Sequence, residues 1–439
     1  MTRIAGSSFE WLEFDKEGKL LSPGAIERIR AILDASGSRD LVIMSHGWNN
    51  DRDDAWALYS QLWNSTSTSL RIGGSDPAKF MVAGILWPAI KYRAHFDLGA
   101  LSDAEAAGMA QGVGSAAGED GDGDLDERLF RQTLDDFVDL VANEAAHDAR
   151  HAAIRFAATG GDAELLLAKL NEAAGDSTGD PELEAEGLPL KGQGSDVLAD
   201  LAPAPSMPVD PELGGGLGIG DILQGLVQGP KAAAARLFNL FTYYTMKKRA
   251  GAVGASLGSK ILPRLQSADP ARLHLIGHSF GARLVTAAVH AAPDNLGTLS
   301  PYSLTLLQGA FSHNAFAAAE AHRRTGAFAG VHRKLTGPMV AMHTHNDRAV
   351  TLAYALASRL ARDAAEAVGD KSDKFGAIGA NGALHLDADY GDPVTIMKPG
   401  AQYQLAPRKV HNVLADACVT SHSDVVNENV GALVAAALR

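Results

Sequence analysis

Continuous apolar segments recur along the chain and predict the strands of a parallel β-sheet. When both faces of a strand are covered, the strand reads as an unbroken apolar run instead of an alternating one. Runs of this kind occupy residues 41–45, 80–87, 273–276, 303–307, 339–343 and 409–414.

Between several of these runs, apolar residues recur at intervals of three and four, which is the period of an amphipathic helix. This spacing predicts helices over residues 23–35, 51–65, 243–265, 282–292, 349–361 and 430–438. Strands that alternate with helices indicate a doubly wound α/β fold, with a mostly parallel central sheet flanked by helices.

The stretch 97–235 interrupts this rhythm because it is rich in Ala, Gly and acidic residues. Residues 97–150 carry 14 Asp and Glu against 3 Arg, a local charge of −11. The stretch predicts an insertion with helices over 125–157 and 163–174, joined by Gly- and Pro-rich linkers. The expected division is a first part of the core (1–96), the acidic insertion (97–235) and a second part of the core (236–439).

Composition narrows the classes of partner. With 46% hydrophobic and 21% charged residues, the 439-residue chain is typical of a folded protein. Its net charge of −13 opposes binding to nucleic acid. The sequence has no signal-like h-region and no apolar run of about 18 residues, so we expect a cytoplasmic protein without a membrane span. Its single cysteine, Cys418, excludes an intramolecular disulfide.

We expect neither a cofactor nor a metal. Two histidine pairs could hold an ion, His147 with His151 and His343 with His345, but neither pair has the Glu of a zincin motif.

The pattern Gly-x-Ser-x-Gly at residues 277–281 carries the candidate nucleophile, Ser279. It follows an apolar strand and precedes a helix, the order that places a serine on a sharp, exposed turn. The same pattern at 254–258 lies inside a helical stretch, so we interpret Ser256 as a small residue that allows close helix packing.

A serine needs a base and an acid that orients the base. Asp347 follows the strand at 339–343, and His422 follows the strand-like run at 409–414. We therefore predict Asp347 as the acid and His422 as the base. Alternatives are an N-cap role for Asp347, an inert loop position for His422, and His411 as the base, although His411 lies within a strand.

Acyl transfer also needs two N–H donors for the oxyanion. The expected donors are the backbone amides of Phe280, which follows the nucleophile, and Trp48, in the glycine-containing loop after the first apolar strand. A plain turn that ends in a helix cap is the alternative for this loop. Four further residues are expected to line the substrate site: His46, Gly47, Trp87 and His278.

Taken together, the segments His46-Gly47-Trp48, Trp87-Pro88 and Gly277-His278-Ser279-Phe280-Gly281, followed by Asp347 and His422, resemble the α/β-hydrolase superfamily, in particular its serine esterases and lipases. The resemblance covers about residues 38–96 and 236–439. It implies an α/β-hydrolase fold with Ser279 as nucleophile, Asp347 as acid and His422 as base, and a large helical insertion where members often carry a lid.

The sequence therefore predicts a serine hydrolase that cleaves carboxylic esters through an acyl-enzyme. An apolar, aromatic segment at 222–244 favours a small-molecule ester with an apolar acyl or aryl group, unless this segment simply packs on the sheet. Amide, thioester or lactone cleavage would use the same groups. The alternative of a different class is a non-catalytic protein of this fold that binds a partner through the acidic insertion.

Overall fold

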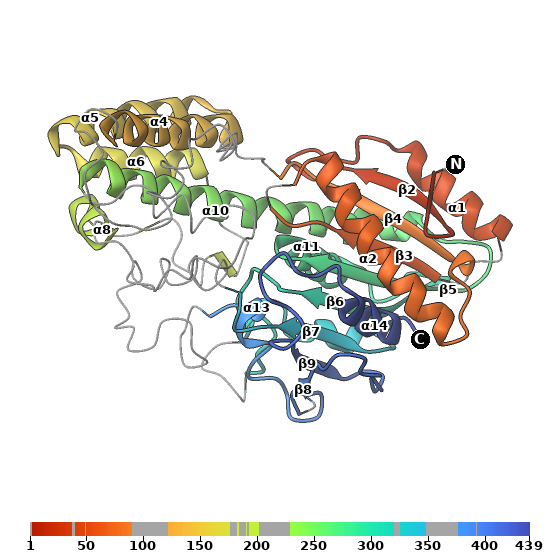
Figure 1. Ribbon diagram of the computed structural model, residues 1–439. Helices are drawn as coiled ribbons and strands as arrows, with labels where there is room; N and C mark the ends of the chain where they lie inside the picture. The colour runs from red at the N-terminus through yellow and green to blue at the C-terminus, as the bar shows by residue number, and fades with distance from the viewer. Residues whose placement is uncertain are drawn as a thin grey trace. The chain divides into compact units, whose positions relative to one another are not determined.

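The apolar runs become strands of one nine-stranded sheet in the computed structural model (Figure 1), with the order β1-β2-β4-β3-β5-β6-β7-β9-β8. Only the pairing of β1 with β2 is antiparallel. The strands are β1 (Thr2–Ile4), β2 (Ser7–Glu13), β3 (Asp40–Ser45), β4 (Phe80–Leu86), β5 (Ala271–His278), β6 (Leu299–Leu307), β7 (Met339–His343), β8 (Thr395–Ile396) and β9 (Val410–Leu414). The prediction of a mostly parallel α/β sheet is confirmed.

The chain divides into two compact units, and the described residues of the first lie within 2–89, 246–347 and 376–439, those of the second within 122–245. The structure describes residues 2–36, 40–48, 50–89, 122–175, 182–183, 190, 193–201, 229–319, 325–347, 376–391 and 393–439. The helix expected at 349–361 lies outside these ranges.

The helices of the first unit cover both faces of the sheet. They are α1 (Gly24–Ser36), α2 (Arg52–Ile72), α11 (Phe280–Ala291), α13 (Ile378–Asn381) and α14 (Glu428–Ala437), with the last part of α10 (Pro230–Ser256) and a π-helical continuation (Leu257–Ile261). Figure 1 shows α2 and α14 side by side. Their buried residues form a core with alternate strand residues such as Val42, Met44 and Val340. α11 packs on β3, β5 and β6.

The second unit is helical, with α4 (Asp122–Val141), α5 (Glu144–Thr159), α6 (Ala163–Ala174), α8 (Gly194–Leu201) and the first part of α10. The single helix predicted over 125–157 is wrong. Ala142 adopts a left-handed φ of 53°, and the side chain of Asn143 accepts the N–H of Ala146 to cap a new helix. The aromatic residues of α10 are buried in this unit, where Phe238 meets Phe137 edge-on at 5.0 Å.

At the amino end of β5, a buried hydrogen-bonded chain joins three strands. The hydroxyl of Ser303 lies 2.8 Å from Nδ1 of His274, whose Nε2 lies 3.1 Å from Asp40. Burial lowers the pKa of His274, against the opposing effect of Asp40, so the ring is neutral. Arg272 also donates to Asp40, at 2.6 Å, and its guanidinium bonds the last carbonyl of the chain, that of Arg439.

None of the helices in the described ranges combines the length and the apolar character that crossing a membrane requires.

Candidate active site

Ser279 lies on a sharp turn between β5 and α11, where its backbone adopts φ 57° and ψ −124°. A residue other than glycine at positive φ costs about 1–3 kcal/mol, and such strain is typical of functional sites. The N–H of Ser279 donates to Leu307 O on β6 at 3.0 Å, and its carbonyl accepts from Ala282 and Ala310. The turn is therefore held by the backbone, while the serine side chain makes no helix-cap hydrogen bond.

Two glycines allow the loop after β3 to approach this turn. A β-carbon at Gly47 would lie 2.6 Å from the Cβ of Ser279, and one at Gly281 would lie 2.3 Å from Ser45 O. Trp48 follows Gly47, and its ring packs on that of Phe280 with centroids 6.0 Å apart. The two residues predicted to supply oxyanion donors are thus brought together beside Ser279.

Asp347 and His422, predicted from separate parts of the chain, form a hydrogen bond. Nδ1 of His422 lies 2.8 Å from Oδ2 of Asp347. Asp347 is fully buried, and the His422 side chain is 20% exposed. Because the carboxylate can only accept, Nδ1 carries the proton and the Nε2 lone pair is left to act as a base.

His278, directly before the nucleophile, binds the backbone of the candidate base. Its Nε2–H donates to His422 O at 2.9 Å, and the two rings lie 4.9 Å apart. Burial lowers the pKa of His278 to about 3, with smaller contributions from His422 and His46. A neutral imidazole therefore links the nucleophile turn to the loop that carries His422. That His278 also touches substrate stays a prediction.

His46 and Trp87 hold the loop after β3. Their rings stack at 5.6 Å, and the Trp87 indole N–H donates to His46 O at 3.1 Å. The Nδ1–H of His46 donates to Gly47 O at 2.8 Å, and burial lowers its pKa to about 4. The His46 N–H donates to the hydroxyl of Tyr59, which itself donates to Ile85 O. His46 and Trp87 are both buried in the protein interior. Their predicted contact with substrate therefore stays a prediction.

Asp416, which follows β9, holds the loop that carries Asp347 in place through hydrogen bonds. One carboxylate oxygen accepts from the Thr344 hydroxyl and the His345 N–H, and the other lies 2.8 Å from His345 Nδ1. Burial alone would raise the pKa of Asp416, but these hydrogen bonds lower it below its usual value. Asp416 and Tyr59 are contacts that the sequence did not predict. An acidic residue just after a predicted strand was a usable signal for Asp416, whereas Tyr59 lies mid-helix and had none.

The rival residues lie elsewhere. His411 is buried within β9, and its Nε2–H donates to Ala406 O at 3.1 Å. Around Ser256, α10 and its continuation approach α11 closely, because β-carbons at Gly254 and Gly258 would lie 2.2 and 2.1 Å from carbonyls of that helix. This agrees with a packing role for Ser256.

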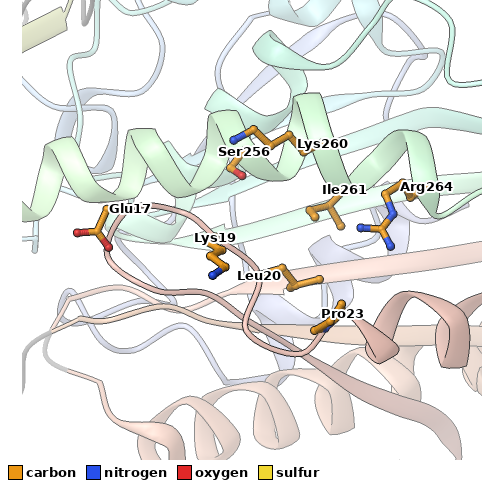
Figure 2. A pocket seen from close by; sticks show the side chains of 8 residues that line it. All are labelled: Glu17, Lys19, Leu20, Pro23, Ser256, Lys260, Ile261 and Arg264. Carbon is orange, nitrogen blue, oxygen red and sulfur yellow. The ribbon is translucent and has the colours of Figure 1, made fainter.

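Ser256 also borders a cavity of about 480 Å³ on the first unit (Figure 2). The described residues that line it are Glu17, Lys19, Leu20, Pro23, Ser256, Lys260, Ile261 and Arg264. None of these is a histidine, so the lining offers Ser256 no counterpart of the pair formed by His422 and Asp347.

Within the described ranges, no cluster of three or more His, Cys, Asp or Glu side chains could hold a metal ion. His147 and His151 are both exposed on α5. Comparison of the chain with protein-family models, curated proteins and solved structures finds no match.

Proposed function

We propose that the protein is a serine hydrolase of the α/β-hydrolase fold that cleaves carboxylic esters. The observation that carries the proposal is the 2.8 Å hydrogen bond between His422 and Asp347, on loops beside a strained serine turn. Ser279, Asp347 and His422 all follow strands of the parallel sheet, at the carboxyl ends where ligands bind in open α/β sheets, and this placement supports the proposal.

In the proposed reaction, Nε2 of His422 takes the hydroxyl proton of Ser279 as Oγ attacks the ester carbonyl. The N–H groups of Trp48 and Phe280 stabilise the oxyanion of the tetrahedral intermediate, aided by the amino end of α11. His422 then gives the proton to the departing alkoxide, which leaves as an alcohol, and the acyl group stays bonded to Oγ of Ser279 as an acyl-enzyme. Water, deprotonated by the same nitrogen, attacks the acyl group and releases a carboxylic acid and Ser279.

Esters are the default substrate because an alkoxide is an easier leaving group than an amide nitrogen. The same groups would serve thioesters and lactones. We further propose that the insertion at 97–235 acts as a lid that selects the acyl chain. A variant lacking 97–235 is then expected to hydrolyse esters with an altered preference for acyl-chain length. An unaltered preference would show that the insertion does not act as a lid.

The test of the function is reaction with a fluorophosphonate probe, followed by peptide mapping, together with turnover of p-nitrophenyl esters. We expect labelling at Ser279 only, and loss of labelling and turnover in Ser279→Ala with a nearly unchanged melting temperature. The matched control is Ser256→Ala, which changes the serine of the second Gly-x-Ser-x-Gly pattern and should retain both activities. Full turnover in Ser279→Ala would refute the proposal and favour a binding protein.

A further inference from the structure

Gln308 directly follows the last residue of β6 and lies opposite Ser279, the candidate nucleophile, on the neighbouring strand. β5 and β6 pair with His278 opposite Leu307, so the next residues along the two strands are Ser279 and Gln308. The Gln308 N–H donates to Met342 O on β7 at 3.2 Å. The backbone of Gln308 therefore lies about one strand spacing, about 4.8 Å, from that of Ser279.

Gln308 also borders the acid. A β-carbon placed at Gly379 would meet Asp347 Oδ2 and Gln308 O, each at 3.0 Å. Gln308 thus lies opposite Ser279 on the neighbouring strand, and Gly379 lies between its carbonyl and the carboxylate of Asp347.

The residue destabilises the fold in two separate ways. Its φ of 50° is left-handed, a conformation that residues other than glycine adopt at a cost. Its side chain is 0% exposed, and neither Oε1 nor Nε2 has a hydrogen-bond partner in the structure as described. A buried amide without partners costs about 1–3 kcal/mol in mutational data. Such costs concentrate where a site is built for a ligand.

We propose that the amide of Gln308 binds a polar group of the substrate, a hydroxyl or carbonyl within a few bonds of the scissile ester. This inference rests on the proposed function and specifies its substrate class. A primary amide offers two donors and an acceptor, so a hydroxyl satisfies it in either direction. An unsubstituted aliphatic ester would leave the amide unpaired in the complex. A site built around a buried polar group discriminates strongly against the analogue that lacks the partner.

The test compares p-nitrophenyl butanoate with p-nitrophenyl 3-hydroxybutanoate. The wild-type protein should have the higher kcat/KM for the hydroxy ester, and Gln308→Met, of similar shape, should reduce this preference about tenfold or more. Gln308→Asn tolerates the left-handed backbone but withdraws the amide by one methylene, so it tests the same preference if Met disturbs the fold. Fluorophosphonate labelling of Ser279 reports that each variant is folded with its nucleophile intact.

The matched control is His332→Leu. His332 is another buried side chain, 3% exposed, whose ring nitrogens have no partner in the described ranges, and it precedes β7 at the opposite edge of the sheet. This variant should keep the wild-type preference. An equal preference in Gln308→Met and wild type, or no wild-type preference, would overturn the inference and indicate that ordered water satisfies the amide. Failure of the wild type to label at Ser279 would overturn the proposed function as well, and the two failures are read from different measurements.

Discussion

Acid should destabilise the first unit through two buried histidines beside the serine turn, His46 and His278. Burial lowers the pKa of His46 to about 4 and that of His278 to about 3, whereas an unfolded histidine titrates near 6.5. Below pH 6.5 the unfolded chain therefore binds protons that the folded chain excludes. The stability that these neutral rings contribute is fully present above pH 6.5 and is lost as the pH falls towards their folded pKa values.

Each such histidine lowers the free energy of unfolding by about 1.4 kcal/mol per pH unit in this window. At pH 5 the loss is about 2 kcal/mol per histidine, so His46 and His278 together account for about 4 kcal/mol. That is a large fraction of the about 5–15 kcal/mol typical of a folded protein. The variant His278→Gln cannot titrate in this range but keeps an N–H donor for His422 O, and it should lose about 2 kcal/mol less than the wild type.

The assay is urea denaturation at pH 7.5, 6.5, 5.5 and 5.0. All five tryptophans lie between residues 11 and 87, so their fluorescence follows the first unit. The difference in free energy of unfolding between wild type and variant at pH 7.5 measures the contacts that the ring has lost, and it is subtracted from the differences at lower pH. The titration of carboxyl groups is common to both proteins and therefore cancels in the comparison. If wild type and variant lose equal free energy between pH 7.5 and 5.0, the reasoning about a buried neutral His278 is wrong.

Three further changes test the geometry of the site. Asp347→Asn should lower kcat by about 10³–10⁴, measured with p-nitrophenyl butanoate, because the amide no longer fixes the tautomer of the base; a loss below tenfold would contradict this. Gly47→Ala should reduce kcat/KM at least tenfold, since its β-carbon would lie 2.6 Å from Ser279 Cβ; wild-type kinetics would show that the loop shifts freely. Asp416→Ala should lower kcat more than it raises KM, because the loop that carries Asp347 loses its hydrogen bonds. His345→Ala, which changes the exposed partner of Asp416, should lower kcat by a smaller factor. Equal losses of kcat in the two variants would argue against a positioning role for Asp416.

The sequence predicted the central strands well because each is buried on both faces and reads as an unbroken apolar run. It missed β1 and β8, which have only three and two residues, and β2, which mixes buried and half-buried residues. It ended α2 too early, at 65, because Ser and Thr over 65–69 are weak helix formers. In the structure Thr66 and Ser67 are buried in α2, and Gly431 of α14 lets the two helices meet there. Tertiary packing thus overrides local propensity.

The candidate site, like the fold, was predicted from the sequence only in part. Ser279, Asp347 and His422 could be found because each follows a recognisable strand, and strand ends converge at one sheet edge. The hydrogen bonds of Tyr59 and the position of Gln308 beside Ser279 could not be predicted, because they depend on which backbone groups meet in three dimensions. The bond from His278 to His422 O was equally hidden, since it joins residues 144 positions apart.

The buried chain from Ser303 through His274 to Asp40 has a consequence for reactivity. β5 carries this serine–histidine–aspartate chain within the sheet, and the turn after β5 carries Ser279 beside the hydrogen-bonded pair of His422 and Asp347. Ser303 lies within β6, is 1% exposed, and its hydroxyl is hydrogen-bonded to His274. The same three residue types therefore serve as a structural link between strands when the serine lies within the sheet. Ser279 differs because its backbone leaves the strand at a left-handed φ of 57°, and if the proposed function holds, this turn is what separates a reactive serine from a structural one.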